Sequence, residues 1–350
     1  MKFLKYLAIL LVALILAFAA FLGMITSKDF KPGATESCQA TGNESGPVAS
    51  DSIFTIATWN IGYFGLGMKS DFFYDGGKMT RPEKDYYREC SERALDYLSA
   101  TGQPDFFFFQ EVDMDSRRSY RENQLDMIAG RLQGYEVIKT LNYKVLFVPL
   151  PVNNPLGKVE SGLVTLSRYK TIENTRFAFS AGFAWPLRLF MLDRCFLLTR
   201  IPHPSGHDIV LINTHNEAFD DGSQRREQMA VLRETMIREY LKGNYVITGG
   251  DWNLNPLGFD PGTLRTGDMG KSVEPRIDQD FLPEGWQWAY DPEVPTNRNV
   301  DQIYQRGKTP VTIIDFFVIS PNVTLLEIKT EDLGFQWADH QPVRMKIRLQ

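Results

Sequence analysis

Short runs of β-branched and aromatic residues, separated by polar or glycine-rich stretches, recur from residue 52 to the C-terminus. Runs of this kind are typical of strands that are buried on at least one face. They predict strands at 52–60, 106–109, 135–139, 145–148, 163–167, 195–200, 209–214, 245–248, 312–319, 325–329 and 343–348.

Other segments carry apolar residues at helical spacing and predict helices over 81–99, 123–132 and 222–241. Pro82 suits the first turn of the first of these helices. Strands and helices are interleaved, but hairpin-like strand pairs dominate the middle of the chain. The pattern therefore predicts an α/β protein in which two mixed sheets face each other with helices outside.

The N-terminus follows a different pattern, because residues 7–25 are apolar and contain no charge. About 20 such residues are enough to span a bilayer. A cleaved signal peptide usually has an apolar core of about 7–15 residues, so the length favours an uncleaved anchor, although AFAA at 17–20 offers a cleavage context. A short leader before a large domain favours a domain outside the cytoplasm, secreted if the leader is cleaved.

Residues 27–52 are rich in Gly, Ser, Thr and Pro, which predicts a flexible linker. The chain is thus divided into a membrane anchor or signal segment at 1–26, the linker at 27–52 and a folded domain at 53–350. Within that domain, 255–284 is rich in Gly, Pro and Asp and is expected to be mostly loop.

Composition narrows the partners of this domain. The 350 residues are 43% hydrophobic, as expected for a sizeable core, and the net charge of −5 provides no overall basic field for nucleic acid. A local basic groove is still compatible with that charge. Cys38, Cys90 and Cys195 form no disulfide framework, since their number is odd, and a Cys90–Cys195 bond stays open.

The stretch VITGGDWNLNP places a carboxylate and an amide two residues apart, just after a strand. In extended chain, Asp251 and Asn253 would share one side while Trp252 packs on the other. The same pair is also typical of a turn cap, in which the side chain bonds nearby backbone. The rest of the chain favours the first interpretation.

Polar residues that a hydrophobic core would not require lie at the ends of several other strands. With Asp251 and Asn253 included, the polar residues at strand ends are Asn60, Glu111, His215, Asp251, Asn253, Asp339 and His340. Asp315 lies within the strand 312–319. A carboxylate inside a strand must be hydrogen-bonded or paired. The chain has four histidines, and the other two, His203 and His207, lie in a turn, PHPSGHD, and are expected in solvent.

These residue types predict a site for a divalent cation. The carboxylates of Glu111, Asp251 and Asp339 and the amides of Asn60 and Asn253 offer oxygen ligands, which suit Mg²⁺ or Mn²⁺. A cation of this kind implies a phosphorylated substrate, because it polarises phosphoryl oxygens and offsets charge on the leaving oxygen.

The two remaining histidines fit the same chemistry. His215 and His340 can donate to a phosphate or transfer protons near neutral pH. Asp315 is expected to orient His340 and to favour its imidazolium form.

The motifs TWNIG, QEVD, SGLVTLSRY, INTH, GGDWN, IDFFVIS and ADHQPV, in this order, resemble those of the endonuclease/exonuclease/phosphatase superfamily, which has the pancreatic deoxyribonuclease-like fold. The resemblance spans about residues 54–349. It implies a four-layer α/β sandwich, two facing mixed β-sheets flanked by helices, with the site at one edge of the sheets.

The resemblance also assigns roles to the residues that match its motifs. Asn60, Glu111 and Asp339 match metal-binding positions, and Asp251 and Asn253 match the pair that aligns the nucleophile and holds the phosphate. His340 and Asp315 match a paired histidine and aspartate, and His215 matches the second histidine. Arg194 sits where some members have a phosphate-contacting arginine, but a surface arginine fits the sequence equally well.

The resemblance leaves several substrate classes open, because the superfamily includes nucleases, deadenylases, sphingomyelinases and inositol-phosphate phosphatases. The apolar stretch 177–193 suits either contact with a bilayer interface or a loop that covers the core or the exit of the anchor. The Cys-Asp-Arg element of the inositol-phosphatase branch is missing from IDFFVIS, which disfavours a phosphoinositide.

The sequence therefore predicts a divalent-metal-dependent hydrolase of a phosphodiester, either nucleic acid or a phospholipid such as sphingomyelin. A phosphomonoesterase acting on inositol or sugar phosphates is one alternative, and a non-catalytic binding module on the same fold is another. We expect a monomer without an obligate protein partner, held at the membrane through residues 7–25.

Overall fold

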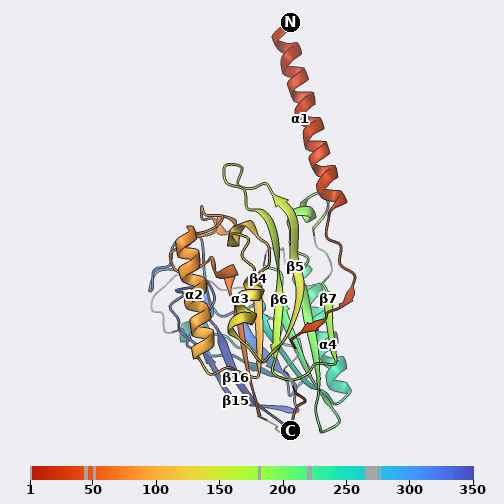
Figure 1. Cartoon of the computed structure of the whole chain (residues 1–350). Coiled ribbons are helices and arrows are strands. Elements are labelled where there is room, and N and C mark those ends of the chain that lie inside the picture. The colour runs from red at the N-terminus through yellow and green to blue at the C-terminus, as the bar shows by residue number, and fades with distance from the viewer. Residues whose placement is uncertain are drawn as a thin grey trace.

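The computed structural model of the protein describes residues 2–42, 46–49, 53–179, 183–218, 223–264, 275 and 277–350. Within these ranges the domain contains two large mixed β-sheets and a short two-stranded ribbon, β12 (Asn297–Arg298) with β13 (Val311–Thr312). Figure 1 shows the two sheets stacked face to face with helices on the outside.

Each sheet has seven strands among the described residues. The first has the order β15 (Val323–Thr330), β16 (Val343–Leu349), β3 (Ile53–Asn60), β4 (Phe106–Asp113), β6 (Gly157–Ser167), β5 (Glu136–Val148) and β2 (Ala40–Thr41). The second has the order β1 (Thr35–Ser37), β7 (Glu173–Ala178), β8 (Cys195–Pro202), β9 (Asp208–His215), β10 (Tyr245–Asp251), β14 (Asp315–Ile319) and β11 (Gln287–Ala289). The parallel pairs β3–β4 and β9–β10 lie at the centres of the sheets.

The core lies in three apolar layers. Between the sheets, Phe108 of β4 meets Phe317 of β14, with ring centroids 6.2 Å apart. Helices α2 (Lys84–Ala100) and α3 (Gln124–Arg131) cover the outer face of the first sheet, and α4 (Ser223–Leu241) covers that of the second through residues such as Leu232. The predicted four-layer sandwich is thereby confirmed.

Several predicted boundaries were wrong, for local reasons. The strands predicted at 135–139 and 145–148 form the single strand β5, whose register shifts near Asn142 let a polar residue enter without ending the strand. Strand β4 continues past Glu111 to Asp113 through a bulge. The run 312–319 is divided between β13 and β14, and α2 begins at Lys84, two residues after Pro82.

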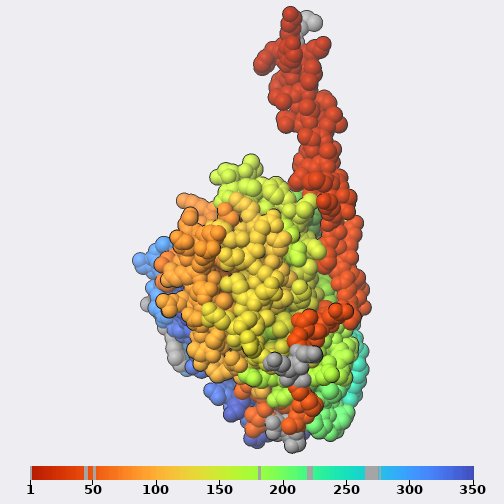
Figure 2. Space-filling model, in the orientation of Figure 1, coloured from red at the N-terminus to blue at the C-terminus, as the bar shows by residue number. Residues whose placement is uncertain are grey.

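Helix α1 (Lys2–Ser27) projects away from the domain, as Figures 1 and 2 show. It is long and apolar enough to cross a membrane, a property shared by signal sequences. The chain that follows runs along the surface of the domain (Figure 2). Where the sequence predicts a flexible linker, β1 pairs with β7 and β2 with β5, because edge strands leave backbone groups available for pairing.

The apolar stretch 177–193 lies at the exit of α1, one of the two interpretations of its sequence; its residues 180–182 fall outside the described ranges. The indole of Trp185 donates to the Thr26 hydroxyl (3.2 Å), and Arg188 pairs with Asp29 at 2.8 Å. All three cysteines are free thiols, so the Cys90–Cys195 bond that the sequence left open is not formed.

Candidate active site

The predicted site residues meet where the central parallel strands end. Strand β3 ends at Asn60, β9 at His215 and β10 at Asp251, and Glu111 lies near the end of β4. A cavity of about 540 Å³ opens at this edge. Of the predicted residues, those that line it are Glu111, Arg194, His215, Asp251, Asn253, Asp339 and His340. Asn60 and Asp315 lie behind it, hydrogen-bonded to Asp251 and His340.

Sheet register aligns three of these residues side by side. His215 on β9 is paired with Asp251 on β10, which is paired with Asp315 on β14. Directly paired residues on neighbouring strands point to the same face of a sheet, so pairing alone brings their side chains together.

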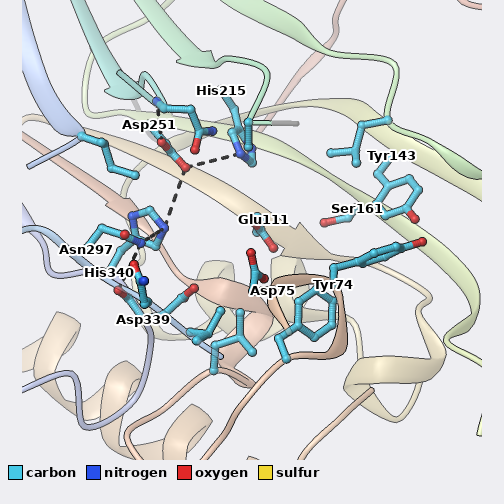
Figure 3. Close-up of a pocket in the computed structure, with 18 of the residues that line it drawn as sticks. Tyr74, Asp75, Glu111, Tyr143, Ser161, His215, Asp251, Asn297, Asp339 and His340 are labelled. Carbon is cyan, nitrogen blue, oxygen red and sulfur yellow. Dashed lines mark hydrogen bonds and ion pairs between the residues drawn. The ribbon is translucent and has the colours of Figure 1, made fainter. Parts of the chain in front are cut away.

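Asp251 is the centre of the cluster, as Figure 3 shows. Its Oδ2 accepts a hydrogen bond from the Asn60 amide (2.9 Å) and lies 3.4 Å from Nε2 of His215 and 3.8 Å from Nε2 of His340. Burial raises the pKa of Asp251 to about 6, with the positive charge of His340 acting against the rise. The carboxyl is thus suited to accept a proton near neutral pH.

Asp251 and Asn253 combine the two interpretations of their motif. Oδ1 of Asp251 accepts from the backbone N–H of Asn253 (3.0 Å), which is a turn cap, while Oδ2 faces the cluster. The strand has already ended, since Asn253 has a left-handed backbone (φ 49°). This turn, rather than strand alternation, brings both side chains to the cavity. Trp252 is buried in the core, stacked 4.9 Å from Phe316.

His340 is held as an imidazolium. Its Nδ1 lies 2.8 Å from Oδ2 of the fully buried Asp315. Burial lowers the pKa of His340, but the nearby carboxylates of Asp315, Asp251 and Asp339 outweigh burial and raise it to about 10. Nε2 lies 3.0 Å from the side-chain nitrogen of Asn297 and 3.8 Å from Oδ2 of Asp251.

His215 is in the opposite state. Its pKa is lowered well below the usual value, first by burial and then by the charges of Arg194 and His340. Nδ1 lies 3.5 Å from the Asn142 amide. The site therefore pairs one charged and one neutral histidine on either side of Asp251, and such divergent environments are typical of acid–base sites.

Glu111 and Asp339 form an acidic wall beside this cluster. Glu111 sits on the β4 bulge with a left-handed backbone (φ 55°), a strained conformation for a residue with a side chain. Burial raises the pKa of Asp339 to about 7, and nearby Glu111 adds to the rise. Oδ1 of Asp339 is buried and has no hydrogen-bond partner among the described residues.

These features fit a hard cation, because an unpartnered buried carboxylate oxygen next to a second carboxylate is otherwise unfavourable. The amide of Asn60 donates to Asp251, and its oxygen accepts from the N–H of Gly62, so Asn60 supports Asp251 directly. A second group of possible metal ligands consists of Asp251, Asp315 and His340, whose ligand atoms lie within 4.8 Å of one another. Asp315 and His340, however, are already hydrogen-bonded to each other.

Several polar residues that line or support the cavity were not predicted from the sequence. Arg118 makes a two-pronged pair with buried Asp113 and lies 3.5 Å from Glu111. Arg298 donates to the backbone oxygens of residues 66, 67 and 70. Asn142 and Asn297 contact the two histidines. Their partners are distant in sequence or follow no periodicity, so no local signal marks them.

Arg194 was left open as a surface residue, and the structure corrects that alternative. The residue is buried at the side of the cavity, with Nε 3.7 Å from a carboxylate oxygen of Glu217. Neither Nε nor Nη1 has a hydrogen-bond partner within the described part of the chain.

The wall away from Asp251 is apolar and aromatic. In Figure 3, Tyr74 and Tyr143 lie across the cavity from Asp251, with Glu111 between. Several other apolar residues that line the cavity pack in one cluster with Tyr143: Leu66, Phe72, Leu156, Leu192 and Val300. A ligand with a charged group at Asp251 could therefore place an apolar or aromatic group against these side chains.

Comparison with known proteins matches residues 57–333 to the endonuclease/exonuclease/phosphatase family profile. Among solved structures, an endonuclease/exonuclease/phosphatase from Beutenbergia cavernae is similar at 16% identity and a TM-score of 0.55, covering 85% of this chain and 72% of that one. The human Nocturnin catalytic domain with bound sulfate has 15% identity and a TM-score of 0.53, covering 85% and 94%.

D. rerio TDP2 complexed with a single-strand DNA product has 16% identity and a TM-score of 0.52, covering 85% of this chain and 100% of that chain. At these identities the likeness is one of fold. Comparison with curated protein sequences gives no match.

Proposed function

Because the chain belongs to the endonuclease/exonuclease/phosphatase family, we propose that it is a divalent-metal-dependent hydrolase of a phosphodiester. This family includes phosphodiesterases, nucleases and phosphatases. One observation carries the proposal: Asp251 lies between a neutral and a charged histidine, in a cavity also lined by Asp339, whose Oδ1 has no hydrogen-bond partner among the described residues.

Each side chain of the site has a distinct role in the proposed hydrolysis. Asp251 accepts a proton from water as the water oxygen bonds to phosphorus and the bond to the leaving alcohol breaks. His340, charged and held by Asp315, gives its Nε2 proton to the departing oxygen. Solvent then returns both groups to their starting states. Asn253 and Arg194 hold the phosphate oxygens, and neutral His215 keeps Asp251 aligned.

Glu111 and Asp339 would hold the cation, with Asn60 keeping Asp251 and Glu111 in place through its amide. We propose Mg²⁺ or Mn²⁺, since the donors are oxygens. When bound, the cation polarises the phosphoryl oxygens and offsets the charge on the leaving oxygen.

The apolar wall of the cavity supports a diester with a lipid or aromatic group. The apolar wall itself contains no Lys or Arg, although Arg118, Arg194 and Arg298 line other parts of the cavity, and the net charge of the chain is −5. We therefore place a phospholipid ahead of nucleic acid. We also propose that α1 anchors the protein as a monomer, with the catalytic domain outside the cytoplasm.

The test is a substrate panel with the full chain in detergent, comparing bis-p-nitrophenyl phosphate, sphingomyelin, single-stranded DNA, RNA and inositol phosphates with Mg²⁺ or Mn²⁺. We expect diester cleavage that EDTA abolishes, and a fall in kcat/KM of about 10²–10⁴-fold in Asp251→Asn and His340→Ala. Equal rates in excess EDTA, or a preference for monoesters, would overturn the proposal.

A further inference from the structure

A second cavity, of about 290 Å³, lies between the catalytic cleft and the segment that follows α1. Arg194 and Leu192 line both cavities, so the two adjoin. Phe30, Lys31 and Pro32, which follow α1 directly, line the second cavity on its other side. Apart from Arg194, the residues that line this second cavity have no role in the hydrolysis described above.

Basic residues outnumber acidic ones in the lining of the second cavity. Lys31, Arg176, Arg188 and Arg194 face two acidic residues, Asp193 and Glu217. Arg176 is 1% exposed and Arg194 is 6% exposed. Charged groups buried to this extent are normally paired and fully hydrogen-bonded.

The two buried guanidinium groups are incompletely paired. Arg176 donates from Nε to the Leu141 carbonyl (3.1 Å) and from Nη2 to the Asp193 carbonyl (2.8 Å), but its Nη1 has no hydrogen-bond partner among the described residues. The same holds for Nε and Nη1 of Arg194, which is 3.7 Å from Glu217, too far for a hydrogen bond. A group with several acceptor oxygens would satisfy these donors, and arginine suits phosphate especially well.

The position of the second cavity indicates where such a group would come from. Contacts between Trp185 and Thr26 and between Arg188 and Asp29 tie its rim to the end of α1. A helix that spans a bilayer ends among lipid headgroups, which are rich in phosphate. We propose that the second cavity binds the phosphate of a membrane lipid headgroup beside the catalytic cleft. This inference rests on the proposed anchoring by α1, and it does not require catalysis.

The first experiment measures binding of inorganic phosphate to the full chain in detergent with EDTA, by calorimetry. Without a cation, the carboxylates of Glu111, Asp251 and Asp339 disfavour phosphate in the catalytic cleft, so binding reports on the second cavity. We expect Arg188→Gln to raise the Kd for phosphate several-fold, because it removes one positive charge from the lining of the second cavity. Lys31→Gln should act in the same direction, and its exposed side chain (59%) makes misfolding an improbable cause.

The matched control is Arg306→Gln, which removes one positive charge from a surface pair with Asp332 outside both cavities and should leave the Kd unchanged. Equal phosphate binding by the wild type, Arg188→Gln and Lys31→Gln would overturn the site, as would absence of binding by the wild type. Phosphate binding by a chain that hydrolyses no diester would support this site while contradicting the proposed function.

The second experiment identifies the source of the phosphate. The full chain is placed in nanodiscs of phosphatidylcholine with or without phosphatidic acid, whose terminal phosphate is exposed. We expect phosphatidic acid to raise the apparent Kd for free phosphate several-fold in the wild type and less in Arg188→Gln, because the lipid competes for the same donors. An unchanged Kd would overturn the lipid assignment and indicate a site for free phosphate.

Discussion

His340 and Asp315 are joined by one hydrogen bond, 2.8 Å from Nδ1 to Oδ2, and the other oxygen of Asp315 has no hydrogen-bond partner among the described residues. Asp315 is fully buried, so its charge is compensated mainly by this imidazole. The pair therefore behaves as one unit, in which Asp315 contributes more than Asp251 or Asp339 to keeping the histidine charged.

Replacing Asp315 by Asn keeps the shape of the side chain but removes the negative charge that stabilises charged His340. We expect kcat/KM on bis-p-nitrophenyl phosphate to fall about 10²–10⁴-fold. In the wild type, activity that needs the charged ring should decline as pH rises through the pKa of His340, about 10. Without the carboxylate that pKa falls, so the decline should move to lower pH. A pH–rate profile measures this, and a decline at the same pH in both proteins would contradict the role of Asp315.

Metal binding should be visible in stability as well as in rate. Mg²⁺ should raise the melting temperature of the wild type, since a ligand at 100 times its Kd adds about 2.7 kcal/mol. In EDTA at pH 8, Asp339→Asn should be more stable than the wild type, because it removes a buried charge and, secondarily, the repulsion between that charge and Glu111. With saturating Mg²⁺ the order should reverse. An order that does not depend on the cation would argue against Asp339 as a ligand.

The left-handed backbone of Glu111 predicts a conflict between stability and activity. Glu111→Gly should be more stable than Glu111→Gln by about 1 kcal/mol, because glycine adopts this conformation without strain. Both variants lose the carboxylate, so both should lose most metal-dependent activity. Urea denaturation gives the comparison, and a glycine variant less stable than the glutamine variant would show that the bulge is not strained.

Asp193 should make stability depend on pH. Burial raises its pKa to about 6, above the value near 4 expected in the unfolded chain. The folded protein therefore favours neutral Asp193. The stability that goes with the neutral form is present in full below a pH of about 4 and is lost as the pH rises through about 6. Asp193→Asn should be more stable than the wild type at pH 8 by about 1–2 kcal/mol, a value reduced for partial solvent exposure. The difference should shrink toward pH 4; a difference independent of pH would exclude titration of Asp193 as its source.

Much of the site could be predicted from the sequence, because its residues lie at the ends of readable strands. The apolar runs before Asn60, His215 and Asp251 mark where each strand ends, and parallel strands bring such ends to one edge. Arg194 shows the limit of this reasoning. Its burial depends on the layout of neighbouring elements, which no local pattern reveals, so the sequence alone could not separate a surface arginine from a buried one.

The layers of the fold could be predicted from the sequence, but the edge strands and the strand with an irregular register could not. Strand β5 contains Asn142, which interrupts the apolar pattern, and only its partner strand β6 makes it continuous. Strands β1 and β2 have no run of β-branched and aromatic residues that would predict a strand. They are ordered by pairing with β7 and β5 rather than by the preferences of their side chains.

The pairing of β1 with one sheet and β2 with the other limits how far the domain can lie from α1. Residues 28–34 alone separate the end of α1 from β1, and seven extended residues span at most about 25 Å. With α1 held in a bilayer, the domain could neither tumble freely nor rise far above the lipid surface. Substrates already resident in that thin layer would meet the cleft continually, whereas a dissolved polymer would first have to approach the bilayer itself.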